Sequence, residues 1–164
     1  MKIGLQLGYW QKNPTPRFIE LAQVAESLGF DSVWTAEAYG SDCFTPLAAI
    51  AASTKRIRLG TGVMQISART PTCAAMTALT LDHISNGRLI LGVGVSGPQV
   101  VEGWYGQPFT KPLERTREWI QIFRQVIARE EPVEFHGEQY NLPCKDGMGL
   151  GKPLKSITHP LRKR

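Results

Sequence analysis

The segment from Ile57 to Gly97 constrains the fold more than any other part of the chain. It holds two apolar runs that end in glycines, joined by a stretch that begins at Thr70-Pro71 and ends at Asn86-Gly87. Continuous apolar runs are typical of strands covered on both faces of a parallel sheet. Thr followed by Pro is a common helix start, and Asn-Gly commonly ends a helix. The segment therefore predicts strand, helix and strand in an α/β fold, in which ligands bind at the carboxyl ends of the strands.

The same alternation extends over residues 1–130. Apolar runs predict four strands, at Lys2–Leu7, Ser32–Ala36, Arg58–Val63 and Arg88–Val93. Helix signals predict four helices, which run from Thr15-Pro16 to Gly29, from Thr45-Pro46 to Ser53, from Thr70-Pro71 to Ile84 and from Leu113 to Arg129. Repeated strand–helix units predict a parallel sheet with right-handed crossovers. The alternation fits both an open doubly wound sheet and one half of an eight-unit barrel.

Residues 131–164 depart from this alternation. Val133–Leu142 alternates around His136-Gly137, which predicts a small β-hairpin. Residues 143–164 are rich in Pro, Gly and Lys and predict no regular element. We therefore expect a single, incomplete domain over 1–164. Its four strand–helix units occupy 1–130, and a hairpin insertion and a basic tail occupy 131–164.

The net charge of +5 comes from the tail rather than from the body of the chain. Residues 147–164 contain no acid, and the residues before them carry 14 basic and 14 acidic side chains. A neutral body without a basic stripe argues against nucleic-acid binding, and we expect the tail to be a solvated end. The five basic residues of the tail are Lys152, Lys155, Arg162, Lys163 and Arg164.

The rest of the composition concerns the compartment. No apolar run approaches the roughly 18–20 residues of a membrane-spanning helix, so no membrane association is expected. Three cysteines at wide spacings favour a reducing cytoplasm over a disulfide framework. The three histidines have no metal-ligand spacing to any other His, Cys or acid, so no metal site is predicted.

Asp82 and Arg88 flank a helix-to-strand turn and are interpreted as a clamp on that turn.

Two groups of residues at predicted strand ends are candidates for function. Glu37 follows the second strand, where an acid can serve as a general acid, base or proton donor. A solvated loop acid or a helix cap explains the same position equally well. The run from Gly92 to Gly97 reads G-x-G-x-x-G, but it follows the fourth strand and meets Pro98 at once. These features disfavour a dinucleotide fingerprint and favour a Gly-rich loop that lines a ligand.

Several motifs together resemble a known family. The run LTLDHISNGRLILGVGVSG resembles the signature of the bacterial luciferase-like superfamily, in which a helix leads into the fourth strand. SVWTAE and IRLGTGV resemble the second and third strands of that family. VSGPQVVEGWYGQPF and EFHGEQYNL are similar to the branch of oxidoreductases that use the deazaflavin coenzyme F420. The resemblance covers essentially the whole chain in order.

The resemblance implies a TIM (β/α)8 barrel, of which this chain supplies the first four units as a half barrel. It also implies that the cofactor lies at the carboxyl ends of the strands, with Glu37 facing its ring as the catalytic acid. Gly62-Val63 matches the site of a non-prolyl cis peptide in a bulge behind the ring. The residues implied to bind the cofactor are Gly62, Val63, Met64 and Gln65 in that bulge, and Gly94, Val95, Ser96 and Gly97 in the loop beside the ring.

The resemblance implies hydride transfer between F420 and a small organic substrate. An FMN-dependent monooxygenase and a non-catalytic half barrel with a role in assembly are the alternatives. Members of the family are about twice as long as this chain and are expected to be homodimers. We therefore expect a truncated fragment that binds cofactor weakly and turns over little. Its uncovered sheet edges predict edge-to-edge pairing or aggregation.

Overall fold

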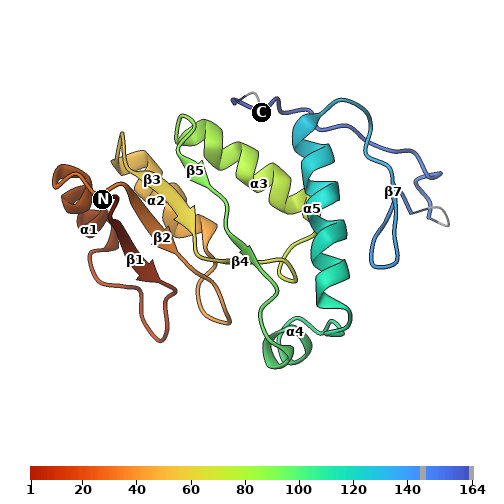
Figure 1. Ribbon diagram of the computed structural model, residues 1–164, viewed down its shortest axis with the longest axis horizontal. Coiled ribbons are helices and arrows are strands. Elements are labelled where there is room, and N and C mark those ends of the chain that lie inside the picture. The colour runs from red at the N-terminus through yellow and green to blue at the C-terminus, as the bar shows by residue number, and fades with distance from the viewer. Residues whose placement is uncertain (145–146, 163–164) are drawn as a thin grey trace.

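The computed structural model describes residues 1–144 and 147–162 and shows a parallel sheet with helices packed on one face (Figure 1). The sheet has the order β1-β2-β3-β5, and each neighbouring pair is parallel. Two short strands, β4 and β6, pair in parallel beyond the ends of β3 and β5. The predicted α/β class and the parallel sheet are therefore confirmed. The strands are β1 (Gly4–Gly8), β2 (Ser32–Thr35), β3 (Arg58–Thr61), β4 (Met64–Gln65), β5 (Leu89–Ile90) and β6 (Val93–Gly94).

The third and fourth strands are interrupted, although the sequence predicted continuous runs to Val63 and Val93. Strand β3 ends at Thr61, and the peptide between Gly62 and Val63 is cis, as the resemblance implied. The Thr61 hydroxyl donates to the Gly92 carbonyl at 2.8 Å and accepts from the Gly92 amide at 2.9 Å. A Cβ on Gly92 would lie 2.3 Å from the Thr61 carbonyl oxygen, so this contact requires glycine. A side-chain contact thus replaces the strand ladder at the break.

The helices are α1 (Phe18–Ser27), α2 (Phe44–Ser53), α3 (Pro71–Ile84), α4 (Pro98–Gly103) and α5 (Pro112–Ala128). Thr70 caps α3 as predicted, because its hydroxyl accepts from the Cys73 amide at 3.2 Å. The helix α4 was not predicted.

Two predicted helix starts are wrong. Helix α1 begins only at Phe18, after Arg17 in the left-handed conformation, so Thr15-Pro16 is not its cap. Helix α2 begins before Thr45-Pro46, because the Asp42 carboxylate accepts from the amides of Phe44 and Thr45 at 2.8 and 2.9 Å. The Asp42 side chain therefore sets the start of α2 one residue earlier than the Thr-Pro pair.

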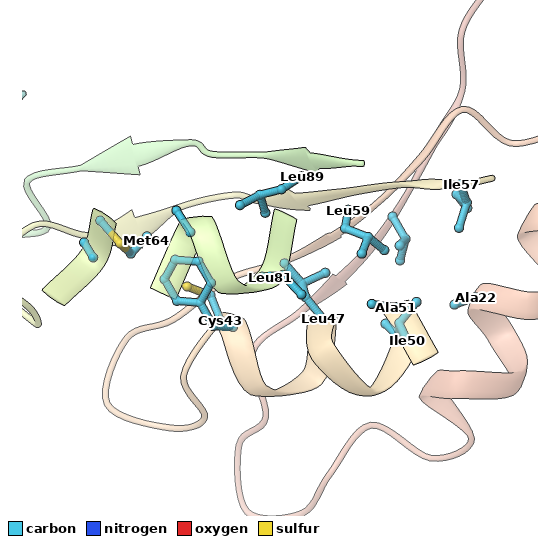
Figure 2. Packing of buried hydrophobic residues seen from close by; sticks show 14 of the residues in the cluster. Ala22, Cys43, Leu47, Ile50, Ala51, Ile57, Leu59, Met64, Leu81 and Leu89 are labelled. Carbon is cyan, nitrogen blue, oxygen red and sulfur yellow. The ribbon is translucent and has the colours of Figure 1, made fainter. Parts of the chain in front are cut away.

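The main core lies between the sheet and its helices. Val33, Leu59 and Leu89 come from neighbouring strands of the sheet and belong to one cluster with Leu47 and Ile50 of α2. Figure 2 shows Leu59 and Leu89 above these two residues of α2. Four of these five side chains have no exposed surface, and 5% of Leu89 is exposed. The burial of this face fixes which side of each strand points toward the helices.

The other face of the sheet carries Trp34 in place of a helix layer. Trp34 is the register partner of Gln6 on β1 and of Gly60 on β3. A Cβ on Gly60 would lie 2.2 Å from the indole ring, and one on Gly4 would lie 2.9 Å from it. The indole therefore lies across strands whose glycines leave room for it.

The predicted hairpin is confirmed with shorter strands, β7 (Phe135–His136) and β8 (Asn141–Leu142), which pair antiparallel. Buried Glu118 of α5 holds its turn, because its carboxylate accepts from the amides of Glu138, Gln139 and Tyr140 at 2.8–2.9 Å. A carboxylate that accepts several backbone amides is well satisfied inside a protein.

The tail is not simply a solvated end. Arg162 donates to both carboxylate oxygens of Asp82 at 3.0 and 2.9 Å and to the Leu89 carbonyl at 3.0 Å. Arg129 donates to the Ser156 carbonyl at 2.6 Å. The tail thus runs past α3 and α5 (Figure 1), and these bonds tether it there, although 57% of the Arg162 side chain stays exposed to solvent. Lys163 and Arg164 lie outside the described residues.

The predicted clamp at the turn after α3 is confirmed and extends further than expected. Asp82 accepts from the Leu89 amide at 3.3 Å. The Arg88 guanidinium donates to the carbonyls of Ser85, Ala51, Thr54 and Ile57 at 2.6–3.1 Å, and to the Thr54 hydroxyl at 2.9 Å. Arg88 therefore ties the start of β5 to the end of α2.

Candidate functional site

The carboxyl edge of the sheet gathers the residues that the sequence singled out. Gln65 of β4 is the register partner of Gly94 of β6, and the Ile66 amide donates to the Gly94 carbonyl at 3.0 Å. The Gln65 amide also donates to the Glu37 carboxylate at 2.9 Å. The tips of the second, third and fourth strands thus meet at one edge, where parallel α/β proteins place their sites.

Val63 presents the most accessible side chain of the bulge, with 40% of its surface exposed. It lies against β6, where a Cβ on Gly94 would come within 2.7 Å of its Cγ2. Gly62 shares this part of the edge, and a Cβ there would face Trp34 at 3.5 Å. An exposed branched side chain beside glycines leaves an apolar edge with little side-chain bulk, which has room for a ring system such as a deazaflavin or a flavin.

The other predicted cofactor contacts are less accessible. Met64 is fully buried and belongs to the same core cluster as Cys43 (Figure 2), so its side chain points away from the open edge. Only 2% of Gln65 is exposed, and Val95 packs against the core. Ser96 has a positive φ of 63° and precedes Gly97, the N-cap of α4. The accessible part of the predicted site is therefore Val63 and the loop that ends at Gly97.

Glu37 is buried rather than solvated. Its carboxylate accepts from the Cys43 amide at 3.2 Å, from the Gln65 amide at 2.9 Å and from Nη1 of Arg69 at 2.6 and 2.9 Å. Its main-chain carbonyl accepts from Nε2 of Gln65 at 2.7 Å. The catalytic role of Glu37 stays a prediction, and the bonds observed are those of a carboxylate that joins neighbouring segments.

Arg69 is the functional candidate that the sequence analysis missed. Only 16% of its side chain is exposed, and it lies beside Asp42 (3.7 Å) and over the Phe44 ring (5.0 Å). Burial is the largest single influence and lowers the pKa of Arg69, but the hydrogen bond to Glu37 and the nearby negative charges together outweigh burial and leave the pKa raised. One signal could have found it: Arg69 follows the third strand as Glu37 follows the second, and adjacent parallel strands place such tips together.

The segment after β6 closes around this pair. Tyr105 donates to the Ala38 carbonyl at 3.2 Å, and Trp119 donates to the Arg69 carbonyl at 3.3 Å. Burial, with a contribution from the negative charge of Glu37, raises the pKa of Tyr105. Burial and Glu37 also raise the pKa of Cys43, so this thiol is not a candidate nucleophile.

Neither a metal site nor a membrane-spanning helix is found among the described residues. Over 1–144 and 147–162, no group of three or more His, Cys, Asp or Glu side chains is placed to hold a metal ion. Within the same ranges, none of the helices combines the length and the apolar character needed to cross a membrane.

Comparison with known proteins decides the family. The family model for luciferase-like monooxygenases matches residues 2–160. The chain belongs to the luciferase-like monooxygenase family. The resemblance stated from the sequence motifs is therefore confirmed, and the site described above is the carboxyl edge of a luciferase-like sheet.

Relatives within this family include oxidoreductases. A Mycobacterium tuberculosis protein assigned by name to the coenzyme F420-dependent oxidoreductases, Rv3520c, is 65% identical over 99% of the chain. The 5,10-methylenetetrahydromethanopterin reductase of Archaeoglobus fulgidus is 32% identical over 96% of it. The crystal structure of the monooxygenase RslO1 from Streptomyces bottropensis is 30% identical over 98%, with a TM-score of 0.78. The chain spans 47%, 46% and 52% of these proteins, or about half their length.

Proposed function

We propose that this luciferase-like chain is one half of a (β/α)8 barrel that carries out F420-dependent oxidoreduction on a small organic molecule. The observation that carries the proposal is the 65% identity, over 99% of the chain, to a relative assigned by name to the F420-dependent oxidoreductases. Two observations support the half-barrel arrangement. The main sheet has four parallel strands, and the chain spans about half the length of its relatives.

The residues at the carboxyl edge fit such a cofactor. Val63 would support the ring with its exposed methyl groups, and the loop from Gly94 to Gly97 would line the ring's side. When bound, F420 would supply hydride transfer, and the protein would hold the cofactor and the substrate in position and exclude water. Glu37 accepts from the Gln65 amide and from Arg69, and 4% of the Glu37 side chain and 16% of the Arg69 side chain are exposed.

An FMN-dependent monooxygenase is the second candidate. It is supported by the structural likeness to the monooxygenase RslO1, with a TM-score of 0.78 at 30% identity. The apolar edge at Val63 has room for a flavin as well as for a deazaflavin, so the choice between them needs a direct measurement.

Titration of the purified chain with F420 and with FMN, followed by fluorescence, tests both proposals. We expect saturable binding of F420 and weaker binding of FMN. Tighter binding of FMN would favour the monooxygenase, and no binding of either would leave a non-catalytic half barrel.

The Val63→Arg variant is expected to weaken F420 binding by at least about tenfold, or about 1.4 kcal/mol, because a charged side chain would replace the apolar support. Val24→Arg, at an exposed position of α1, is the matched control and should leave the affinity unchanged.

We also propose that two copies of the chain associate through α2 and α3. Asp82 is the one Asp, Glu, Lys or Arg in these two helices, and it is buried. Their outer faces instead present Thr45, Met76 and Ile84 around a groove of about 330 Å³. An uncharged helix surface of this kind is typical of an interface between subunits.

Sedimentation equilibrium tests this association. We expect a concentration-dependent dimer that Met76→Lys converts to monomer, because the substitution places a charge in the interface. Leu21→Lys on α1 is the control and should leave the dimer intact. A monomer in the unmodified chain at all concentrations would overturn the proposal.

A further inference from the structure

The carboxyl edge of the sheet contains one buried ion pair, which the function proposed above does not yet use. Nη1 of Arg69 contacts both carboxylate oxygens of Glu37, at 2.6 and 2.9 Å. Only 4% of the Glu37 side chain and 16% of the Arg69 side chain are exposed. The two residues come from different loops, 32 positions apart in the sequence.

The remaining bonds of Glu37 join two further segments. Oε1 accepts from the Gln65 amide of β4, and Oε2 accepts from the Cys43 amide before α2. Both carboxylate oxygens are thus used by donors that belong to the protein frame. A carboxyl group in this position cannot exchange a proton with a ligand without first breaking those bonds.

We propose that Arg69 is a positioning residue that acts through Glu37 to fix the β2–α2 loop and β4 as one unit behind Val63. The inference rests on the proposed function insofar as Val63 is taken to support a cofactor. It assigns Glu37 the same positioning role in place of direct proton transfer. Because β4 follows Val63 without a break, movement of Gln65 would displace the surface that Val63 presents.

Physical chemistry favours positioning over general stabilisation. A buried ion pair often contributes little stability compared with apolar side chains of the same volume, because both charges lose their hydration. Its best-attested use is to select one arrangement of the segments that it joins. Here the cation also lies over the Phe44 ring and near Asp42, so Arg69 is held from three sides.

Amide hydrogen exchange tests the inference without any cofactor. We expect Glu37→Gln and Arg69→Met each to raise the exchange rates of the Gln65 and Cys43 amides at least tenfold, while the core amides of Val33 and Leu59 keep theirs. Arg69→Lys, a milder variant, keeps the charge but loses the forked geometry and should give a smaller increase. The exposed pair of Arg17 and Glu20 supplies the control: Arg17→Met and Glu20→Gln should leave all four rates unchanged.

A parallel F420 titration separates this inference from the proposed function. We expect the affinity for F420 to fall at least tenfold in Glu37→Gln and in Arg69→Met, and the combined variant to lose less than the two losses added together. If the unmodified chain binds no F420 but the two amides respond selectively, the F420 proposal is overturned and positioning is supported. If F420 binds and the two amides do not respond, positioning is overturned and the F420 proposal stands. An equal rise in exchange at all four amides would mean general destabilisation and would also overturn positioning.

Discussion

Replacement of Arg88 by Met is expected to lower the free energy of unfolding by about 3–4 kcal/mol. The guanidinium donates to four backbone carbonyls and to the Thr54 hydroxyl, and three of those carbonyls belong to the end of α2 and the segment before β3. Methionine fills a similar volume but donates nothing, so these half-enclosed acceptors lose their partner. Burial lowers the pKa of Arg88, yet an arginine remains charged at neutral pH and keeps all of its donors.

Urea denaturation, followed by circular dichroism, measures this effect. The free energy of unfolding of Arg88→Lys should lie between those of the unmodified chain and of Arg88→Met, because the three donors of an ammonium group share one nitrogen and cannot span carbonyls on two sides. Arg124→Met is the control, since Arg124 is exposed on α5 and, within 1–144 and 147–162, its side chain makes no hydrogen bond. A change below about 1 kcal/mol in Arg88→Met would contradict the view that this residue joins α2 to β5.

Replacement of Glu118 by Gln is expected to cost about 2–3 kcal/mol and to release the hairpin from α5. The carboxylate accepts from three successive amides of the hairpin turn, at Glu138, Gln139 and Tyr140. A glutamine side chain presents one oxygen and one NH₂ group, so at least one amide would face a donor instead of an acceptor. A Cβ on Gly137 would lie 2.4 Å from Oε2 of Glu118, which shows how closely the turn approaches this group.

Release of the hairpin should change the exchange of its own amides as well as the stability of the whole protein. We expect the amides of residues 138–140 to exchange much faster in Glu118→Gln, while those of the sheet change only with the global stability. Glu114→Gln on the same helix is the matched control, because Glu114 forms an ion pair with Arg117 near the surface. Equal exchange of the turn amides in both variants would refute the role given to Glu118.

Features that depend on local sequence could be predicted, and features that depend on contacts between distant segments could not. Thr70-Pro71 was identified correctly as a helix start because capping involves a few neighbouring residues. Thr15-Pro16 has the same pattern, but Arg17 adopts the left-handed conformation there and delays the helix. The six-residue helix α4 is too short for its periodicity to be recognised.

In the candidate site, too, local features could be predicted from the sequence and contacts between distant segments could not. Its strand tips were located from glycines and apolar runs, and motif resemblance identified the Gly62–Val63 bulge. The pairing of Glu37 with Arg69 depends on the register between β2 and β3, which a single sequence does not reveal. The bond from Arg162 to Asp82 spans 80 positions and was missed for the same reason.

The position of Trp34 gives the molecule a natural optical reporter. Its indole lies on the helix-free side of the sheet, across Gly60 and Gly4, and is neither fully covered nor fully solvated. Any cofactor, second polypeptide or neighbouring copy that reaches this side would change the polarity around that ring. The emission wavelength of Trp34, isolated by replacing the other three tryptophans with phenylalanine, would therefore show whether this face of the sheet is solvated or covered by a bound molecule.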